Sequence, residues 1–289
     1  HTLLSKNEKL EDIYGRILKF LIKFFYNRAS LIVSVSERAA QDLIKNFNIK
    51  PSKVHIIPNP IPVKKIREQA KDDLGEYAPI FKHPVIITAG RLTHAKGQWH
   101  LIRIFKKLKE KFPELKLVIL GDGELKDYLI KLSKQLGLKT YTNGEITDSD
   151  IYFLGFQDNP YKFFKYSKVF ILPSLREALP LVVLEVMALG VPVIASDCGG
   201  TREILAPSTD PNYETRKVEF AEYGILLPVF NEEVNRENRL TSVEKKWLKL
   251  LEELIKDDTR LAHYSKRSTR RAEDFSSEKI KQKWLELII

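Results

Sequence analysis

Short apolar runs recur along the chain from Pro84 onwards, and segments with helical periodicity separate most of them. The runs are rich in β-branched residues and occupy residues 85–89, 115–120, 151–154, 169–172, 191–195 and 224–227. The helical segments cover residues 98–111, 123–136, 180–189 and 242–255, and residues 261–289 supply one or two more helices. Strands that are apolar on both faces and joined by helices form sheets covered on both sides, so the pattern predicts an α/β fold with a parallel sheet.

The carboxyl ends of these strands are where a ligand site is expected, because ligands of open parallel sheets bind there. We therefore expect five loops to share one crevice, namely those that follow Ala89, Leu120, Leu154, Leu172 and Ala195. Glycine opens the first three of these loops, and it lets a backbone approach a ligand closely. A simple turn explains the glycine of the second loop equally well.

The pattern before Pro84 is shorter and ends in prolines. Residues 31–35 and 53–57 are typical of short buried strands, and Ser36 is a suitable N-cap for a helix that continues through Leu43. The proline-rich segment 58–62 can continue neither kind of structure. We interpret it as a hinge between two domains.

Residues 10–26 have a helical apolar stripe and several lysines, and two interpretations fit. The first is a helix that faces a core and exposes its basic side. The second is a helix that rests on an anionic membrane surface, since aromatic residues lie beside the lysines. The stripe consists of Leu10, Ile13, Ile17, Leu21 and Phe24.

Two glutamates bracket the start of the helix at 180–189. Pro180 suits the first turn of a helix, so Glu177 belongs to the preceding loop and Glu185 lies just over one turn inside. The free N–H groups near Leu181 lie at the positive end of the helix dipole and suit a phosphate. Glu185 is a charge within the almost wholly apolar run LVVLEVMAL, where a charge needs a functional reason.

Residues 177–185, 190–196 and 199–203 together resemble the retaining glycosyltransferases of family 4. The resemblance implies the GT-B fold, in which two Rossmann-like domains face each other. It also implies that Glu177 contacts the transferred sugar and Glu185 the ribose of the sugar nucleotide. The intervening Ala178, Leu179 and Leu181 would lie against the donor, although a glycine is common in place of Ala178.

Other loops carry further candidates for the same site. Arg91 and Lys96, in a loop that begins at Gly90, could clamp a diphosphate, and this loop resembles the G-R…K-G loop of the family. The resemblance implies that backbone near Gly155 meets the nucleotide base, and either base stacking or core packing explains Phe156. His1 resembles the histidine that faces the donor sugar across the cleft. Gly121 completes the candidates.

Composition narrows these expectations. The chain has 289 residues and one cysteine, which excludes an internal disulfide and fits a reducing, cytoplasmic setting. No apolar run is long enough to span a membrane. The net charge of +10 favours anionic partners, but the basic residues are interspersed with acidic ones and no nucleic-acid motif is present, so we expect no nucleic-acid partner.

The resemblance suggests a domain plan. Residues 1–62 would be the closing part of an acceptor-side domain with its hinge, and residues 63–260 the nucleotide-sugar-binding domain. Residues 261–289 would be helices that cross back to the first domain. Most of the first domain of a GT-B enzyme would then lie ahead of His1, so we expect a fragment or a processed chain.

The expected activity is transfer of a hexose or hexosamine from a nucleotide-diphosphate sugar, most simply a UDP sugar, to a glycan or lipid-linked acceptor in surface polysaccharide assembly. No cofactor is expected, and the lack of a paired-aspartate motif predicts independence from metals. Attachment to the inner face of the cell membrane is left open by residues 10–26. Three alternatives remain: a nucleotide-sugar epimerase or phosphorylase on the same fold, and a non-catalytic remnant that binds nucleotide diphosphates.

Overall fold

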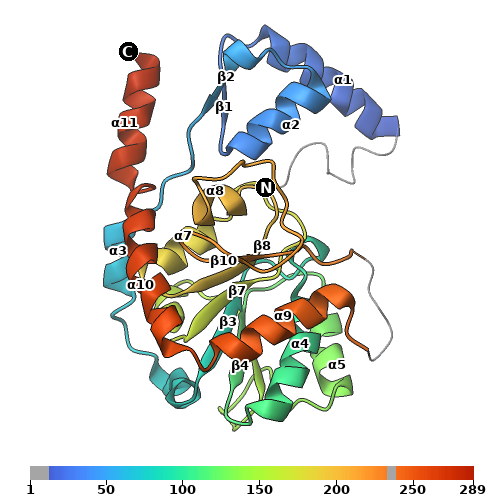
Figure 1. Cartoon of the computed structure of the whole chain (residues 1–289), viewed down its shortest axis with the longest axis vertical. Coiled ribbons are helices and arrows are strands. Elements are labelled where there is room, and N and C mark those ends of the chain that lie inside the picture. The colour runs from blue at the N-terminus through green and yellow to red at the C-terminus, as the bar shows by residue number, and fades with distance from the viewer. Residues whose placement is uncertain (1–12, 233–238) are drawn as a thin grey trace.

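The main body of the protein is one large sheet, seen in a computed structural model that describes residues 13–232 and 239–289 (Figure 1). Its strands are β3 (Val85–Ala89), β4 (Lys116–Leu120), β5 (Thr140–Tyr141), β6 (Ile151–Gly155), β7 (Val169–Leu172), β8 (Val193–Ser196), β9 (Glu219–Phe220) and β10 (Ile225–Leu227). Their order in the sheet is β5-β6-β4-β3-β7-β8-β10-β9. The expected parallel sheet is confirmed, except that β9 pairs antiparallel with β10 at one edge.

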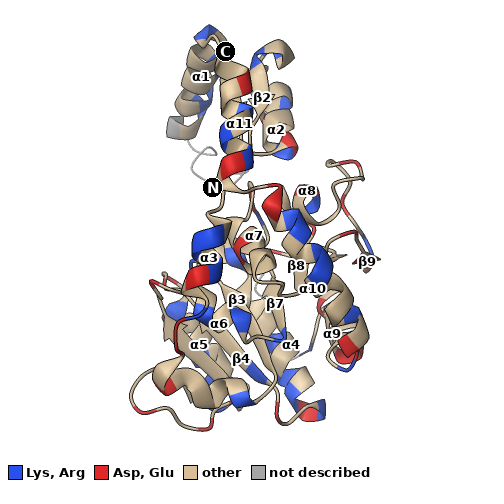
Figure 2. Ribbon diagram, turned by 90° about the vertical axis from the view of Figure 1, so that its left-hand side faces the viewer, with Lys and Arg blue, Asp and Glu red and all other residues tan. Residues whose placement is uncertain are grey.

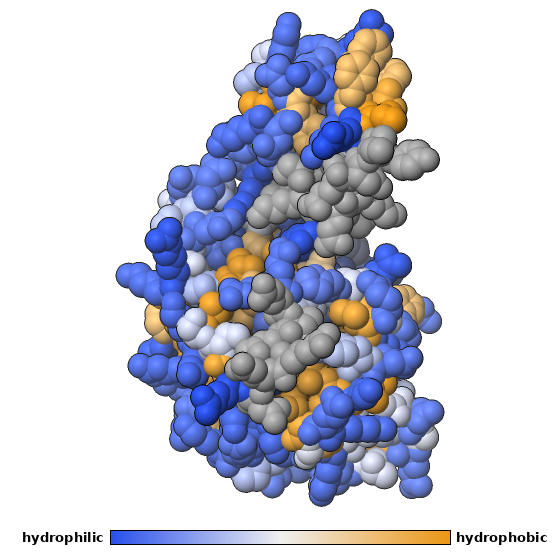
Figure 3. Space-filling view, turned by 90° about the vertical axis from the view of Figure 1, so that its right-hand side faces the viewer, coloured by the Kyte–Doolittle hydropathy of each residue, from blue (hydrophilic) through white to orange (hydrophobic). Residues whose placement is uncertain are grey.

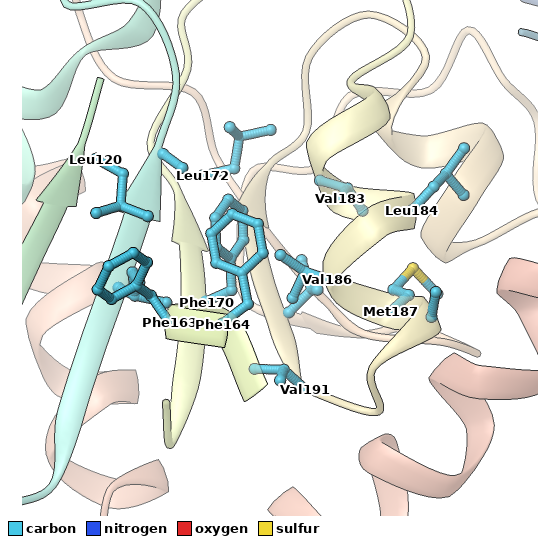
Figure 4. Close-up of a cluster of buried hydrophobic side chains, with 14 of the residues drawn as sticks. Leu120, Phe163, Phe164, Phe170, Leu172, Val183, Leu184, Val186, Met187 and Val191 are labelled. Carbon is cyan, nitrogen blue, oxygen red and sulfur yellow. The ribbon is translucent and has the colours of Figure 1, made fainter. Parts of the chain in front are cut away.

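The two faces of the sheet build separate cores because side chains alternate along each strand. In β3, Ile86 belongs to one core, and Val85 and Ile87 to the other. The first core is covered by α4 (Gln98–Lys111), α5 (Lys126–Gln135) and α9 (Ser242–Leu254). The second is covered by α3 (Val63–Gln69), α6 (Tyr161–Lys165), α7 (Leu181–Ala188) and α8 (Thr201–Leu205). Figure 4 shows side chains of α6 and α7 gathered against Phe170 and Leu172 of β7.

The first part of the chain forms a small separate unit. It comprises α1 (Ile13–Arg28), β1 (Ile32–Ser34), α2 (Glu37–Phe47) and β2 (Val54–Ile56), and β1 and β2 pair in parallel. A linker leads from this unit to α3. At the other end of the chain, α10 (Asp258–Glu273) packs on α7, and α11 (Ser277–Ile288) extends beside the small unit (Figure 1). The linker is tied to this end, since the N–H of Ile61 donates to the carbonyl of Phe275 at 2.9 Å.

Short 3₁₀ helices complete the elements, at Pro51–Lys53, Gly75–Lys82 and His94–Lys96. The hydroxyl of Ser36 accepts from the N–H of Ala39, so the expected N-cap of α2 is confirmed. Basic and acidic residues are mixed over most of the ribbon, with a basic run along α10 (Figure 2).

Within the described residues, no core covers the apolar stripe of α1 that was expected to be buried. Ile17, Leu21 and Phe24, which lie on the stripe expected to be buried, are 53%, 40% and 40% exposed. Ile22 does pack against the small cluster formed by α2 and the residues that follow it. Most apolar side chains of α1 lie on the surface (Figure 3). Nowhere in the described chain is a helix both long and apolar enough to cross a membrane.

Candidate functional site

Two adjoining cavities lie at the carboxyl ends of the strands. The first has a volume of about 540 Å³ and is lined by Ala89, Gly90, Arg91, Leu120, Gly121, Asp122, Phe156, Gln157, Pro160, Phe164, Val182 and Glu185. The second, of about 470 Å³, is lined by Asn59, Gly90, Arg91, Thr93, Ala95, Lys96, Arg176, Glu177, Leu179, Pro180, Leu181 and Val182. The cavities share Gly90, Arg91 and Val182, so the loops after β3, β4, β6 and β7 meet in one crevice as expected.

The fifth loop, after β8, does not line either cavity, so this part of the expectation is wrong. It lies behind the β7–α7 loop instead. Gly199 has a φ of +54°, and a Cβ atom there would stand 1.9 Å from the carbonyl oxygen of Glu177. The N–H of Gly200 donates to the carbonyl of Ala178 at 2.8 Å. This loop therefore packs against the backbone of Glu177 and Ala178, and Gly199 must be a glycine because its backbone touches that of Glu177.

Glu177 is a buried carboxylate held by two donors. Its Oε1 accepts from the ammonium of Lys96 at 2.6 Å and from the hydroxyl of Ser174 at 2.6 Å, and the side chain is 4% exposed. A buried charge needs such partners, since an unpaired one costs several kcal/mol. The sequence predicted both Glu177 and Lys96 as site residues but did not predict that they pair.

Groups that suit an anion converge where the cavities join. Arg91 is exposed and forms no ion pair with any residue in the described ranges. The helix α7 starts at Leu181 after Pro180, whose side chain provides no cap. The N–H groups of Leu181 and Val182 therefore have no intrahelical acceptor, and they lie at the positive end of the helix dipole. A diphosphate placed there would meet a guanidinium, an ammonium and a helix N-terminus.

Glu185 lies at the apolar end of the crevice. Burial raises the pKa of its carboxyl group above the usual 4.5, while a hydrogen bond from Tyr161 acts in the opposite direction. Burial and the nearby carboxylate together raise the pKa of Tyr161 to about 12. The tyrosine therefore stays protonated at neutral pH and can donate to Glu185. The remaining wall is aromatic and apolar, with Phe156 and Phe164.

The other candidates divide into those that line the crevice and those that support it. Phe156 is 75% exposed, which excludes core packing as its role. A Cβ atom on Gly121, whose φ is +127°, would stand 2.1 Å from the carbonyl oxygen of Gly90, so this glycine is needed where two loops touch. Gly155 and Ala178 do not line the cavities, and the carbonyl of Gly155 accepts from the N–H of Gly121 at 2.7 Å. His1 lies outside the described residues.

Sequence reasoning missed several lining or supporting residues, among them Asn59, Thr93, Tyr161, Ser174 and Arg176. Asn59 stands between two prolines that were interpreted only as a hinge. Tyr161 belongs to the five-residue helix α6, which is too short to give a periodic signal. Only Arg176 could have been found from the sequence, because it directly precedes Glu177, which was itself predicted to lie in the site.

Comparison with family models gives two matches. Residues 73–212 match the model described as glycosyl transferases group 1, and residues 1–65 match the model described as glycosyltransferase family 4. The chain is 37% identical over 285 residues to an uncharacterized glycosyltransferase of Methanocaldococcus jannaschii, covering 96% of this chain and 68% of that protein. It is 31% identical over 272 residues to a Campylobacter jejuni enzyme, covering 94% of this chain and 63% of the enzyme. That enzyme is named N-acetylgalactosamine-N,N'-diacetylbacillosaminyl-diphospho-undecaprenol 4-alpha-N-acetylgalactosaminyltransferase.

A solved structure has the same fold. The Anabaena protein HepE, in complex with UDP and glucose, superposes with a TM-score of 0.73 at 19% sequence identity. The match covers 95% of this chain and 67% of that protein. The GT-B fold expected from the sequence is thus confirmed.

Proposed function

The chain belongs to the glycosyl transferases of group 1, and on that premise we propose that it moves a hexose or hexosamine from a UDP sugar to a glycan or lipid-linked acceptor with retention of the anomeric configuration. One observation carries the proposal. A cavity with an aromatic wall and Glu185 joins a cavity with Glu177 and Lys96, and Arg91 lines both. A sugar nucleotide has the same sequence of parts: a base and ribose, a diphosphate, and a sugar.

The chemistry follows from where charge develops. When the bond between the sugar and the diphosphate breaks, the leaving diphosphate gains negative charge. Arg91, Lys96 and the N-terminus of α7 would stabilise that charge more in the transition state than in the ground state, which is what accelerates a reaction. Glu177 would orient the sugar hydroxyls, and Glu185 would accept a hydrogen bond from the ribose.

The choice of donor and acceptor rests on relatives. The HepE complex contains UDP and glucose, and the name of the Campylobacter enzyme describes an undecaprenol-linked acceptor.

A lipid-linked acceptor in surface polysaccharide assembly would suit a protein on the inner face of the cell membrane. The exposed aromatic residues of α1, beside Lys19 and Lys23, would rest on anionic lipid there. Replacing Phe20 and Phe25 by Ser should then reduce sedimentation with anionic vesicles, and unchanged sedimentation would contradict this placement.

The test of function is product analysis with a labelled donor. The protein is incubated with UDP-glucose or UDP-N-acetylhexosamines and lipid-linked or glycan acceptors, and products are examined by NMR for anomeric configuration. We expect a new glycosidic bond to the acceptor with the anomeric configuration of the donor, release of UDP and no loss of rate with EDTA, since metal independence is part of the proposal. An epimerised donor, or an inverted product, would overturn it. Binding of UDP without any turnover would favour a non-catalytic remnant.

A further inference from the structure

Two segments far apart in the sequence meet beside the β7–α7 loop: the N-terminus of α2, from the small unit, and α8, from the large one (Figure 1). The hydroxyl of Ser36 donates to the carbonyl of Ala178 at 3.1 Å. The same oxygen accepts from the N–H of Ala39 at 3.2 Å, and Ser36 is 1% exposed. One buried hydroxyl therefore caps α2 and also bonds to the residue that follows Glu177.

Glu203 of α8 makes the second contact. Its two carboxylate oxygens accept from the backbone N–H groups of Glu37 and Arg38, at 2.7 and 2.9 Å. These are amide groups of the first turn of α2, which have no intrahelical acceptor, and a carboxylate there also meets the positive end of the helix dipole. The guanidinium of Arg271 fixes α8 by donating to the backbone carbonyls of Glu203 and Ile204.

The first contact reaches Glu177 through its backbone, and the second holds the N-terminus of α2, which carries Ser36, against α8. Ala178 is the residue after Glu177, and its carbonyl is shared between Ser36 and Gly200. The linker at 58–62 joins the two units, so a hinge motion there would separate α2 from α8 and break both contacts. The carbonyl of Ala178 would keep Gly200 as a partner, so the loop would loosen without unfolding.

We propose that Ser36 and Glu203 are positioning residues which, when the two units are closed, hold the β7–α7 loop so that Glu177 faces the sugar. Closure of the cleft is thereby transmitted to a residue at the sugar end of the site. The mechanical coupling stands on the contacts alone, and its effect on turnover rests on the proposed function.

The first test measures the coupling by amide hydrogen exchange and needs no ligand. Ser36→Gly removes the hydroxyl, yet glycine at an N-cap costs α2 only a few tenths of a kcal/mol. Because one such hydrogen bond is worth roughly 1 kcal/mol, we expect exchange in residues 175–181 to become about fivefold faster, with β3 and β4 unchanged. Ser30→Gly, at an exposed bend in the same unit, is the matched control. Unchanged exchange in residues 175–181 would overturn the proposal.

The second test measures catalysis. Ser36→Gly should lower kcat for sugar transfer about fivefold while the Kd for UDP stays within twofold, because Glu177 faces the sugar and not the nucleotide. Glu203→Gln, whose amide oxygen can accept from one of the two N–H groups, should give an intermediate loss. A parallel loss of UDP affinity would indicate general misfolding and contradict a positioning role. If the unaltered protein fails to turn over any UDP sugar, the proposed function fails, and hydrogen exchange still decides the coupling.

Discussion

The two cavities share three residues, yet the carboxyl groups that line them have opposite environments. Glu177 is matched by an ammonium and a hydroxyl, each 2.6 Å away. Glu185, eight positions later, faces a tyrosine in an apolar setting, and burial raises its pKa. A glutamate at one end of the crevice is therefore a carboxylate with two donors, and a glutamate at the other end is a carboxyl group whose ionisation is disfavoured by burial. The first end suits charge development, and the second suits binding of a neutral base and ribose.

Replacing both Arg91 and Lys96 should remove the positive charge that stabilises the leaving diphosphate in the proposed reaction. For Arg91→Ala with Lys96→Ala, we expect the transfer rate to fall by roughly 10³-fold or more, since one donor to a developing charge is worth about 10²–10³. Steady-state kinetics with a UDP sugar measures this. Transfer near the normal rate would refute the diphosphate clamp.

The two single substitutions should nevertheless differ in their effect on the free energy of unfolding. Arg91 is exposed and unpaired within the described chain, so Arg91→Ala should leave the free energy of unfolding unchanged. Lys96→Ala leaves Glu177 buried beside Ser174 alone, and should lower that free energy by about 1–3 kcal/mol. Denaturant titration of the two single variants gives the comparison.

Replacing the carboxylate with two donors should affect turnover more than affinity. Glu177→Gln keeps the shape of the side chain and removes the charge that Lys96 and Ser174 hold. We expect kcat to fall by about 10²-fold with the Kd for UDP little changed, because the proposed contact of Glu177 is to the sugar. Glu110→Gln, at an exposed position of α4, is the matched control. A pure loss of UDP affinity would place Glu177 at the nucleotide end and remove the contrast between the cavities.

The apolar end should respond in affinity. Phe156 is 75% exposed on the wall of the first cavity, where it can stack on a base. Stacking of a base on an aromatic side chain is worth about 1–3 kcal/mol, so Phe156→Ala should weaken UDP binding by roughly 5–150-fold. Isothermal titration calorimetry with UDP measures the effect, and Phe220→Ala, an exposed aromatic outside both cavities, serves as control. An unchanged Kd would leave the exposure of Phe156 unexplained.

Much of the fold could be predicted because its signals are local. The strands β3, β4, β6, β7, β8 and β10 fall on the expected apolar runs, whereas β5 does not, and α7 begins immediately after Pro180 as expected. The failures lie where local pattern carries no signal. The edge strand β9 falls in a polar stretch, where pairing with β10 decides the structure. An amphipathic pattern in α1 also cannot reveal whether anything covers its apolar side.

Part of the crevice lining was predicted residue by residue, but the contacts between those residues were not. Lys96 and Glu177 are 81 positions apart, and only the folded sheet brings their loops together. The loop after β8 was expected to line the crevice because it follows a strand like the others. Its Gly199 instead packs on the backbone of Glu177, a contact that depends on how far each of the two loops extends beyond the end of its strand. No spacing in the sequence indicates that distance.

The smallest expected effect concerns the carboxyl group whose ionisation is disfavoured by burial. In the folded chain, burial raises the pKa of Glu185 above 4.5, whereas in the unfolded chain it is normal. An acid whose pKa is raised by folding destabilises the fold once the pH exceeds the unfolded value, and this cost disappears below it. Glu185→Gln is neutral at every pH. We therefore expect the variant to be more stable than the unaltered protein at pH 7 and equal to it near pH 4, as measured by urea unfolding.

Function should change in the other direction. In the proposed complex, an ionised Glu185 would accept a hydrogen bond from a ribose hydroxyl, and the protonated form would accept it less well. UDP affinity of the unaltered protein should therefore begin to fall, on acidification, at a pH above that of an ordinary carboxyl group, and Glu185→Gln should bind UDP about fivefold more weakly without this dependence. A variant that is less stable at pH 7 would show that Glu185 is a satisfied structural charge like Glu177, and the two ends of the crevice would then be alike.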